Sequence, residues 1–196
     1  LSIFVLLTIV LDTGRAVRAR RAIAGEGTLP ALWSLLRRNP RRYGGFVVHL
    51  GVVLMVLGIT GSMNFSQEKE VTLAPGESVE LGRFTLRFEG LQASERPSHS
   101  RVEAAFRVFN DRHDLGLLSP ALKFFPGRDS PIGRAVLRMG WKEDLYVILS
   151  GFSEIKAGQA TVKVLVRPLM AWIWAGGAVI VAGALLALFP LRPAQT

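Results

Sequence analysis

The chain contains 196 residues, has a formal net charge of +9 and lacks cysteine. The lack of cysteine excludes disulfides and thiolate metal sites, and the length allows one or two domains. Hydrophobic residues make up 49% of the chain, and many of them gather in long runs beside polar segments. This mixture predicts membrane-spanning helices joined to a sizeable polar domain.

A strongly basic chain can bind nucleic acid, but the distribution of charge argues against that class of partner here. The arginines before the central apolar run are opposed only by Asp12 and Glu26. They are Arg15, Arg18, Arg20, Arg21, Arg37, Arg38, Arg41 and Arg42. Positive charge beside an apolar segment is typical of a cytoplasmic loop, so we expect contact with membrane lipid and none with nucleic acid.

Residues 1–11 are apolar but only about half as long as a membrane span requires. They lack the flanking features of a signal peptide, so we interpret them as the end of a transmembrane helix that stops at Asp12. The chain opens with Leu inside an apolar run. We therefore expect it to be a piece of a longer polypeptide or one product of a split one.

Residues 12–43 form a basic connector that we expect to be cytoplasmic. Within it, residues 29–38 place three leucines on one helical face, and Pro30 lies near the start of this predicted helix. A short helix in the membrane interface and a packed helix–helix linker explain the segment equally well. Asn39 and Pro40 are expected to end it.

Residues 44–63 form a second apolar run. About twenty residues at 1.5 Å per residue span about 30 Å, which predicts a transmembrane helix. Gly44, Gly51 and Gly58 recur at every seventh position and form a stripe along one face. Small residues let a neighbouring helix approach closely, so we expect this stripe to contact another helix.

His49 is the one ionisable side chain inside this run, and it lies about 140–160° around the helix from the glycine stripe. Gly45, Val52 and Val53 are its predicted neighbours, and Gly45 leaves room for a bulky group. An ionisable residue within a span is costly and therefore indicates a function. His49 and its neighbours form the candidate site.

Three roles for His49 compete. A structural histidine hydrogen-bonded to a neighbouring helix is the simplest. A proton relay would require further Asp, Glu or His within the spans, and the sequence has none there. An axial haem ligand fits best, because b-type haem between helices requires a histidine, apolar walls and clearance. His99 and His113 lie far along the polar domain, so we expect the second axial ligand to come from outside this sequence.

Residues 64–167 change to a period of two, which predicts strands. The alternating positions are Val71 and Leu73; Val79 and Leu81; Phe84, Leu86 and Phe88; Val102, Ala104, Phe106 and Val108; Leu145, Val147 and Leu149; Val162, Val164 and Val166. About seven short strands are expected to form an antiparallel sandwich or barrel that folds without the spans. Turns are predicted at residues 75–77 and 111–114, a loop at 126–131 and a short helix at 132–139.

His99 and His113 are expected to be solvated polar residues in a loop and a turn, and no catalytic residues are predicted.

Residues 168–190 form the last predicted transmembrane helix, followed by a cytoplasmic tail at residues 191–196. Trp172 and Trp174 are placed as an aromatic belt, and Gly176, Gly177 and Gly183 as close-packing positions. The predicted fold class is an α+β membrane protein with two complete transmembrane helices, a partial one and an inserted antiparallel β domain.

Residues 41–54, Arg-Arg-Tyr-Gly-Gly-Phe-Val-Val-His-Leu-Gly-Val-Val-Leu, resemble the signature helix of the CcmF family, the haem lyase subunits of bacterial cytochrome c maturation. Further similarity covers nearly the whole chain in the order of the family. It includes residues 70–73, 118–126, 144–149 and 167–177.

This resemblance implies that His49 is one axial ligand of a haem b. It implies a bacterial inner-membrane protein with residues 64–167 in the periplasm. It also implies a part in covalent haem attachment to apocytochrome c. The implied partners are the remaining part of the haem lyase, other cytochrome c maturation subunits, a haem chaperone and apocytochrome c.

This sequence lacks the tryptophan-rich haem-handling segment of the family, its flanking histidines and the second transmembrane ligand. The resemblance is therefore to the C-terminal module of the lyase, which we do not expect to be active alone. The alternative, from a different functional class, is a non-enzymatic membrane adapter whose β domain docks partner proteins. A b-type haem spectrum in a complex that contains the chain would distinguish the two.

Overall fold

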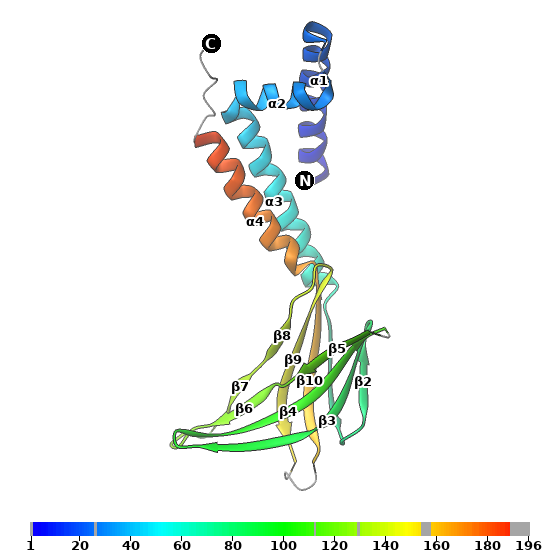
Figure 1. Ribbon diagram of the computed structural model, residues 1–196, viewed down its shortest axis with the longest axis vertical. Coiled ribbons are helices and arrows are strands. Elements are labelled where there is room, and N and C mark those ends of the chain that lie inside the picture. The colour runs from blue at the N-terminus through cyan, green and yellow to red at the C-terminus, as the bar shows by residue number, and fades with distance from the viewer. Residues whose placement is uncertain (1, 26, 112, 129, 154–157, 189–196) are drawn as a thin grey trace. The chain divides into compact units, whose positions relative to one another are not determined.

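The computed structural model describes residues 2–25, 27–111, 113–128, 130–153 and 158–188 (Figure 1). The chain divides into two compact units. The helical unit comprises Leu1–Gly61 and Leu169–Thr196, and the β unit comprises Ser62–Pro168. The fold is therefore α+β, with a β structure inserted between helical segments.

Four helices are described: α1 (Ser2–Ala24), α2 (Thr28–Arg38), α3 (Pro40–Asn64) and α4 (Met170–Leu188). Among the described residues, α3 and α4 are the two helices long and apolar enough to cross a membrane. Helix α2 confirms the predicted short helix, and its C-cap residue Asn39 donates its backbone N–H to the carbonyl oxygen of Leu35 at 3.0 Å.

Helix α1 corrects the expectation that the first helix stops at Asp12. It continues as one helix of 23 residues through Thr13 and Gly14 to Ala24. Gly costs about 1 kcal/mol within a helix and Asp or Thr less, whereas the Ala and Arg residues that follow are strong helix formers. Asp12 also forms an ion pair with Arg42 of α3 at 2.5 Å. Continuing the helix is therefore favoured over breaking it.

The glycine stripe of α3 faces α4, as expected, and Figure 1 shows these two helices side by side. A Cβ added to Gly44 would lie 2.7 Å from the carbonyl oxygen of Gly183, and one added to Gly51 would lie 2.7 Å from that of Gly176. The backbones thus meet at two glycine pairs spaced by seven residues. Gly177 was expected to join them, but a Cβ there would meet nothing within 4 Å.

The β unit is a sandwich of two antiparallel sheets rather than a barrel. One sheet has the order β1-β10-β9-β8, the other β2-β3-β4-β6-β7 with β5 paired to β4. The bounds are β1 Gln67–Leu73, β2 Ser78–Leu81, β3 Phe84–Arg96, β4 His99–Asn110, β5 His113–Leu118, β6 Ala121–Phe124, β7 Ile132–Arg134, β8 Val136–Arg138, β9 Glu143–Phe152 and β10 Ala160–Pro168.

The core lies between the sheets and contains most of the apolar members of the alternating runs, with Val71 and Leu81 partly buried against it. Phe88 and Phe106 are fully buried, with ring centroids 5.1 Å apart, and Val147 and Val164 of the other sheet belong to the same cluster. The expected turn at residues 75–77 is present, and Gly76 there has a φ of +90°, which favours glycine.

The predicted helix at residues 132–139 is wrong. This segment forms β7, which pairs with β6, and β8, which pairs with β9. Ala135 lies between them, so the chain passes from the six-stranded sheet to the four-stranded sheet at this point. Pairing with the edges of β6 and β9 determines the conformation of this segment. These edges lie outside the local sequence pattern, so the pattern does not predict the pairing.

Two other segments differ in part from the expected loops. Of the turn predicted at residues 111–114, Asp111 is a turn residue, whereas His113 and Asp114 belong to β5; Arg112 lies outside the described residues. His99 begins β4 instead of lying in a loop. The predicted loop at residues 126–131 is irregular where it is described, and Asp129 lies outside the described residues.

Candidate functional site

His49 is exposed on α3, away from the glycine stripe that contacts α4. Its Nδ1 lies 2.7 Å from the carbonyl oxygen of Gly45, one turn earlier. A carbonyl oxygen only accepts, so Nδ1 carries the proton and donates this hydrogen bond. The neutral imidazole then has its lone pair on Nε2, which is the nitrogen available to a ligand or metal.

A small apolar cavity of 180 Å³ lies beside this imidazole, between α1 and α3. It is lined by Phe4, Val5, Thr8, Ile9, Phe46 and His49. The Thr8 hydroxyl is already donated to the carbonyl oxygen of Phe4 at 2.9 Å. The imidazole is therefore the polar group of this cavity that remains available to a ligand.

Helix α1 supplies four of the lining residues, none of which was among the predicted site residues. Phe4, Val5, Thr8 and Ile9 follow the spacing i, i+1, i+4, i+5 of one helical face, which was the available signal. No pattern in the sequence says which helix that face contacts. The tertiary structure alone identifies α3 as its neighbour.

An ion pair holds α1 against α3 near the cavity. Arg42 Nη2 lies 2.5 Å from Asp12 Oδ2, and the two side chains are 53% and 37% exposed. The Arg42 guanidinium also lies 5.8 Å from the centroid of the Phe46 ring, which lines the cavity. One cation thus contacts both helices, and it lies at the start of the helix that carries His49.

The predicted neighbours of His49 differ in accessibility. A Cβ added to Gly45 would meet nothing within 4 Å, so the surface over this residue is open. Val52 is 45% exposed on the same helix, whereas Val53 is only 4% exposed. Gly45 and Val52 are therefore available to a group that lies over His49, and Val53 is enclosed.

Among the described residues there is no cluster of three or more His, Asp or Glu side chains that could hold a metal ion. His99 stacks on Phe125 with ring centroids 5.1 Å apart, and its Nδ1 lies 2.9 Å from the Ser98 hydroxyl. His113 is exposed at the start of β5. The site can therefore offer one imidazole and an apolar wall, which suits axial ligation of a planar cofactor.

Both the sequence and the fold of the chain match CcmF proteins. The family model described as "CcmF C-terminal beta-sandwich" matches residues 64–168, more than half of the chain. The cytochrome c-type biogenesis protein CcmF of Pseudomonas fluorescens is 31% identical over 193 residues, covering 98% of this chain and 27% of the relative. The CcmF of Pseudomonas aeruginosa is 30% identical over 167 residues, covering 85% and 25%.

The solved structure of "Cytochrome c Heme Lyase CcmF" has the same fold, with a TM-score of 0.63 and 24% sequence identity. The similarity covers 94% of this chain and 34% of that chain. The chain spans about a quarter of the length of the curated relatives, at 25% and 27%. It therefore belongs to the CcmF family and corresponds to the C-terminal part of its members.

Proposed function

We propose that the chain is the C-terminal module of a membrane haem lyase, in which His49 is an axial ligand of haem b. The observation that carries this proposal is the hydrogen bond from His49 Nδ1 to the Gly45 carbonyl oxygen at 2.7 Å. Histidines that bind metals usually donate their second ring N–H to a carbonyl or carboxylate, which fixes the tautomer and the ring orientation. His49 has the same arrangement, with Nδ1 hydrogen-bonded to a carbonyl oxygen and Nε2 left as the possible metal ligand.

The surrounding residues fit one face of a haem. Phe4, Ile9 and Phe46 give an apolar wall beside the imidazole, and Gly45 leaves open space over the helix. His49 is the one histidine in the sequence of this unit, so a second axial histidine is expected from outside this sequence. When bound, the iron of haem b would have its potential set by its axial ligands and by the polarity of this wall.

We place α3 and α4 in the bacterial inner membrane, the connector at residues 12–43 in the cytoplasm and the β unit in the periplasm. Exposed apolar side chains on both helices, such as Leu57 and Val181, support the proposed location of α3 and α4 in the membrane. The arginine cluster before α3 supports the orientation, because one arginine at the centre of a span costs about 2.5–3.5 kcal/mol on insertion scales.

In this proposal the module takes part in covalent haem attachment to apocytochrome c, together with the remaining part of the lyase, other maturation subunits and a haem chaperone. The relatives that it matches are named as cytochrome c-type biogenesis proteins. The role assigned to the β unit is docking, since no cluster of side chains that could hold a metal ion occurs among its described residues. Catalytic groups would come from outside this sequence.

The first test is the haem spectrum of the complex assembled from this chain and the remaining part of the lyase. His49→Ala should abolish the b-type spectrum or weaken it several-fold, while His49→Cys should give an altered spectrum. His99→Ala and His113→Ala are matched controls and should leave it unchanged. A full, unchanged spectrum in His49→Ala would refute the ligand assignment, and no b-type haem in the unsubstituted complex would favour the adapter.

The second test is the topology. Because the chain lacks cysteine, single cysteines at the exposed positions Ser98 and Ala22 can be labelled without background. A membrane-impermeant thiol reagent added from the periplasmic side should label Ser98→Cys. It should label Ala22→Cys only after the membrane is opened. Labelling of both from the periplasm would contradict the proposed orientation.

A further inference from the structure

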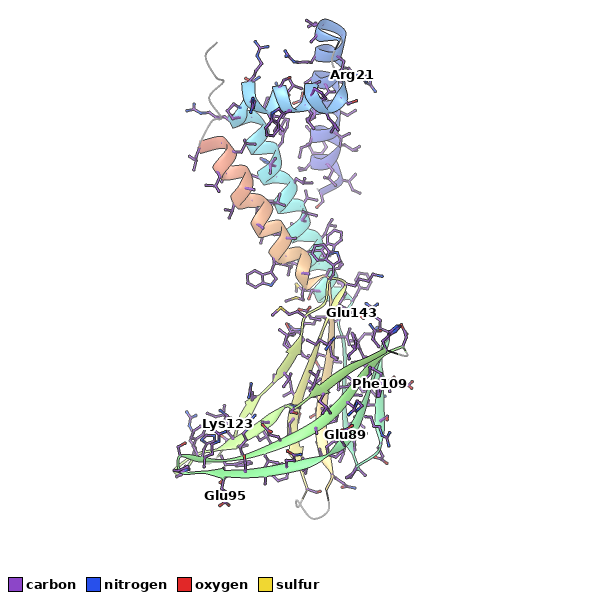
Figure 2. All side chains as sticks on the ribbon, in the orientation of Figure 1. Arg21, Glu89, Glu95, Phe109, Lys123 and Glu143 are labelled. Atoms are coloured by element: carbon purple, nitrogen blue, oxygen red, sulfur yellow. The ribbon has the colours of Figure 1, made fainter. Side chains whose placement is uncertain are left out.

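The β unit has one end at which the chain both enters and leaves it. Gln67 of β1 pairs with Val166 of β10, and Pro168 of β10 pairs with Glu143 of β9. Figure 2 shows Glu143 at this end of the sandwich, and Glu95 and Lys123 at the other. The loop Met139–Lys142, which joins β8 to β9 and which we call the tip loop, therefore lies at the end that continues into α3 and α4.

The most exposed large apolar side chains of the β unit gather in two segments at this end. Within its described residues, those more than 60% exposed are Met63 (78%), Phe65 (71%), Met139 (78%) and Trp141 (69%). Met63 and Phe65 belong to the segment that enters the unit, and Met139 and Trp141 belong to the tip loop. An exposed apolar group of this kind marks a surface that meets a membrane or a partner.

The tip loop is held in place by a hydrogen bond to Asp144 of β9. The backbone N–H of Gly140 donates to Asp144 Oδ1 at 2.9 Å, and Asp144 is only 7% exposed. A Cβ at Gly140 would collide with the carbonyl oxygen of Glu143, so no other residue fits this turn without moving the backbone. Met139 and Trp141 are therefore presented outward by a fixed turn on either side of Gly140.

A basic hollow of 310 Å³ lies beside the tip loop. Its cationic lining residues are Arg83, Arg138 and Lys142. Arg83 is paired with Glu143, and Arg138 Nη1 donates to the carbonyl oxygen of Leu115 at 2.7 Å. These contacts fix the two guanidinium groups at the wall of the hollow, and Lys142 is exposed. The hollow therefore places positive charge beside the apolar side chains of Met139 and Trp141.

We propose that the tip loop is a membrane-interface anchor, with Met139 and Trp141 in the interface and the basic hollow against the phosphate of a phospholipid headgroup. Trp at the headgroup level and Arg or Lys beside phosphate are the residues that the interface favours. The connection to both apolar helices at this end favours lipid over a protein partner. This inference rests on the proposed placement of α3 and α4 in the membrane.

The test uses the full chain reconstituted in phosphatidylglycerol–phosphatidylcholine vesicles that carry spin-labelled lipid. Substituting Phe for Trp33, Trp172 and Trp174 leaves Trp141 as the single tryptophan. Its emission should be blue-shifted and quenched several-fold more by headgroup-level spin labels than that of a control fluorophore. The control carries Ser94→Trp in a chain whose four tryptophans are replaced, at an exposed position near the opposite end.

Equal quenching of Trp141 and the Ser94→Trp control would overturn the proposal. So would a Trp141 that is shielded both from lipid spin labels and from aqueous iodide, because a protein surface would then cover it. A chain that retains only Trp174 separates these results from a failure of the membrane placement, since Trp174 should be quenched by lipid whenever α4 lies in the bilayer. Lys142→Gln should reduce the response to anionic lipid about twofold, and Lys123→Gln should not.

Discussion

The two units achieve close packing by opposite means. In the β unit, large side chains fill the space between two sheets, and Phe88, Phe106 and Leu86 are fully buried. In the helical unit, the backbones of α3 and α4 approach each other at glycines, which have no side chain: Gly51 meets Gly176, and Gly44 meets Gly183. Water drives the first kind of packing by the hydrophobic effect, whereas backbone proximity suits helices whose surroundings are themselves apolar.

The outer surfaces differ in the same way. Polar residues alternate outward along the strands of the β unit, while α3 leaves Val52, Val56, Leu57 and Ile59 each more than 35% exposed. A helix with apolar side chains around most of its circumference is buried in protein or in lipid. The outer surface of the β unit is thus polar and that of α3 is largely apolar, and the following substitutions test how each unit is held together.

The largest effect is expected from the core of the β unit. Phe106→Ala removes a fully buried ring that packs on Phe88 at 5.1 Å. It should lower the free energy of unfolding of this unit by about 3–5 kcal/mol. Denaturant unfolding followed by the β-sheet circular dichroism signal measures it. Leu117→Ala, at a position 53% exposed, is the control and should change the free energy by no more than about 0.5 kcal/mol.

A smaller effect is expected from the glycine contact of the helices. A Cβ at Gly176 would lie 2.7 Å from the carbonyl oxygen of Gly51 and 2.8 Å from the backbone N of Met55, and backbone atoms cannot rotate away. Gly176→Ala should therefore destabilise the helix pair by about 1–3 kcal/mol. Unfolding in detergent micelles, followed by the helical signal, measures the change.

Gly177→Ala is the matched control, one residue along the same helix. Its Cβ would meet nothing within 4 Å, and Ala is the better helix former, so this variant should be neutral or slightly more stable. If the two variants lost the same stability, the idea that backbone contact at the glycine pairs holds α3 to α4 would be wrong.

The smallest effect is expected on the polar surface of the β unit. The backbone N–H of Gly116 donates to Asp114 Oδ1 at 2.8 Å, and Arg107 Nη1 donates to Oδ2 at 2.9 Å. These two contacts, the Gly116 hydrogen bond first, lower the pKa of Asp114 below its ordinary value. Because the folded-state pKa is the lower one, the stabilisation is present above the unfolded-state pKa and is lost as pH falls through the folded-state value.

Asp114→Asn should therefore slightly lower the denaturant midpoint of the β unit at neutral pH. As the pH is lowered from the unfolded-state pKa of Asp114 through its folded-state pKa, the midpoint of the variant should also fall less steeply than that of the unsubstituted chain. Arg107 also donates to Glu89 at 2.8 Å, so the remaining cation stays paired in the variant. Coincident midpoint curves for the two proteins would show that this surface contact contributes nothing to stability.

The sequence by itself determined the features that depend on local periodicity. The seven-residue spacing of Gly44, Gly51 and Gly58 is enough to predict a helix contact, and the alternating runs that contain Phe88 and Phe106 are enough to predict two-sided strands. The same helical geometry places His49 away from the glycines. These predictions hold because a repeat of seven residues or of two fixes which side chains share a face.

The tertiary structure alone decided which faces meet. It identified α4 as the helix against the glycine stripe and α1 as the wall beside His49, joined through Asp12 and Arg42. It also made strands of the segment predicted as a helix at residues 132–139, because the free edges of β6 and β9 take it as their partner. Contacts between residues distant in sequence outweigh local preferences of about 1 kcal/mol or less, and they have no periodicity of their own in the chain.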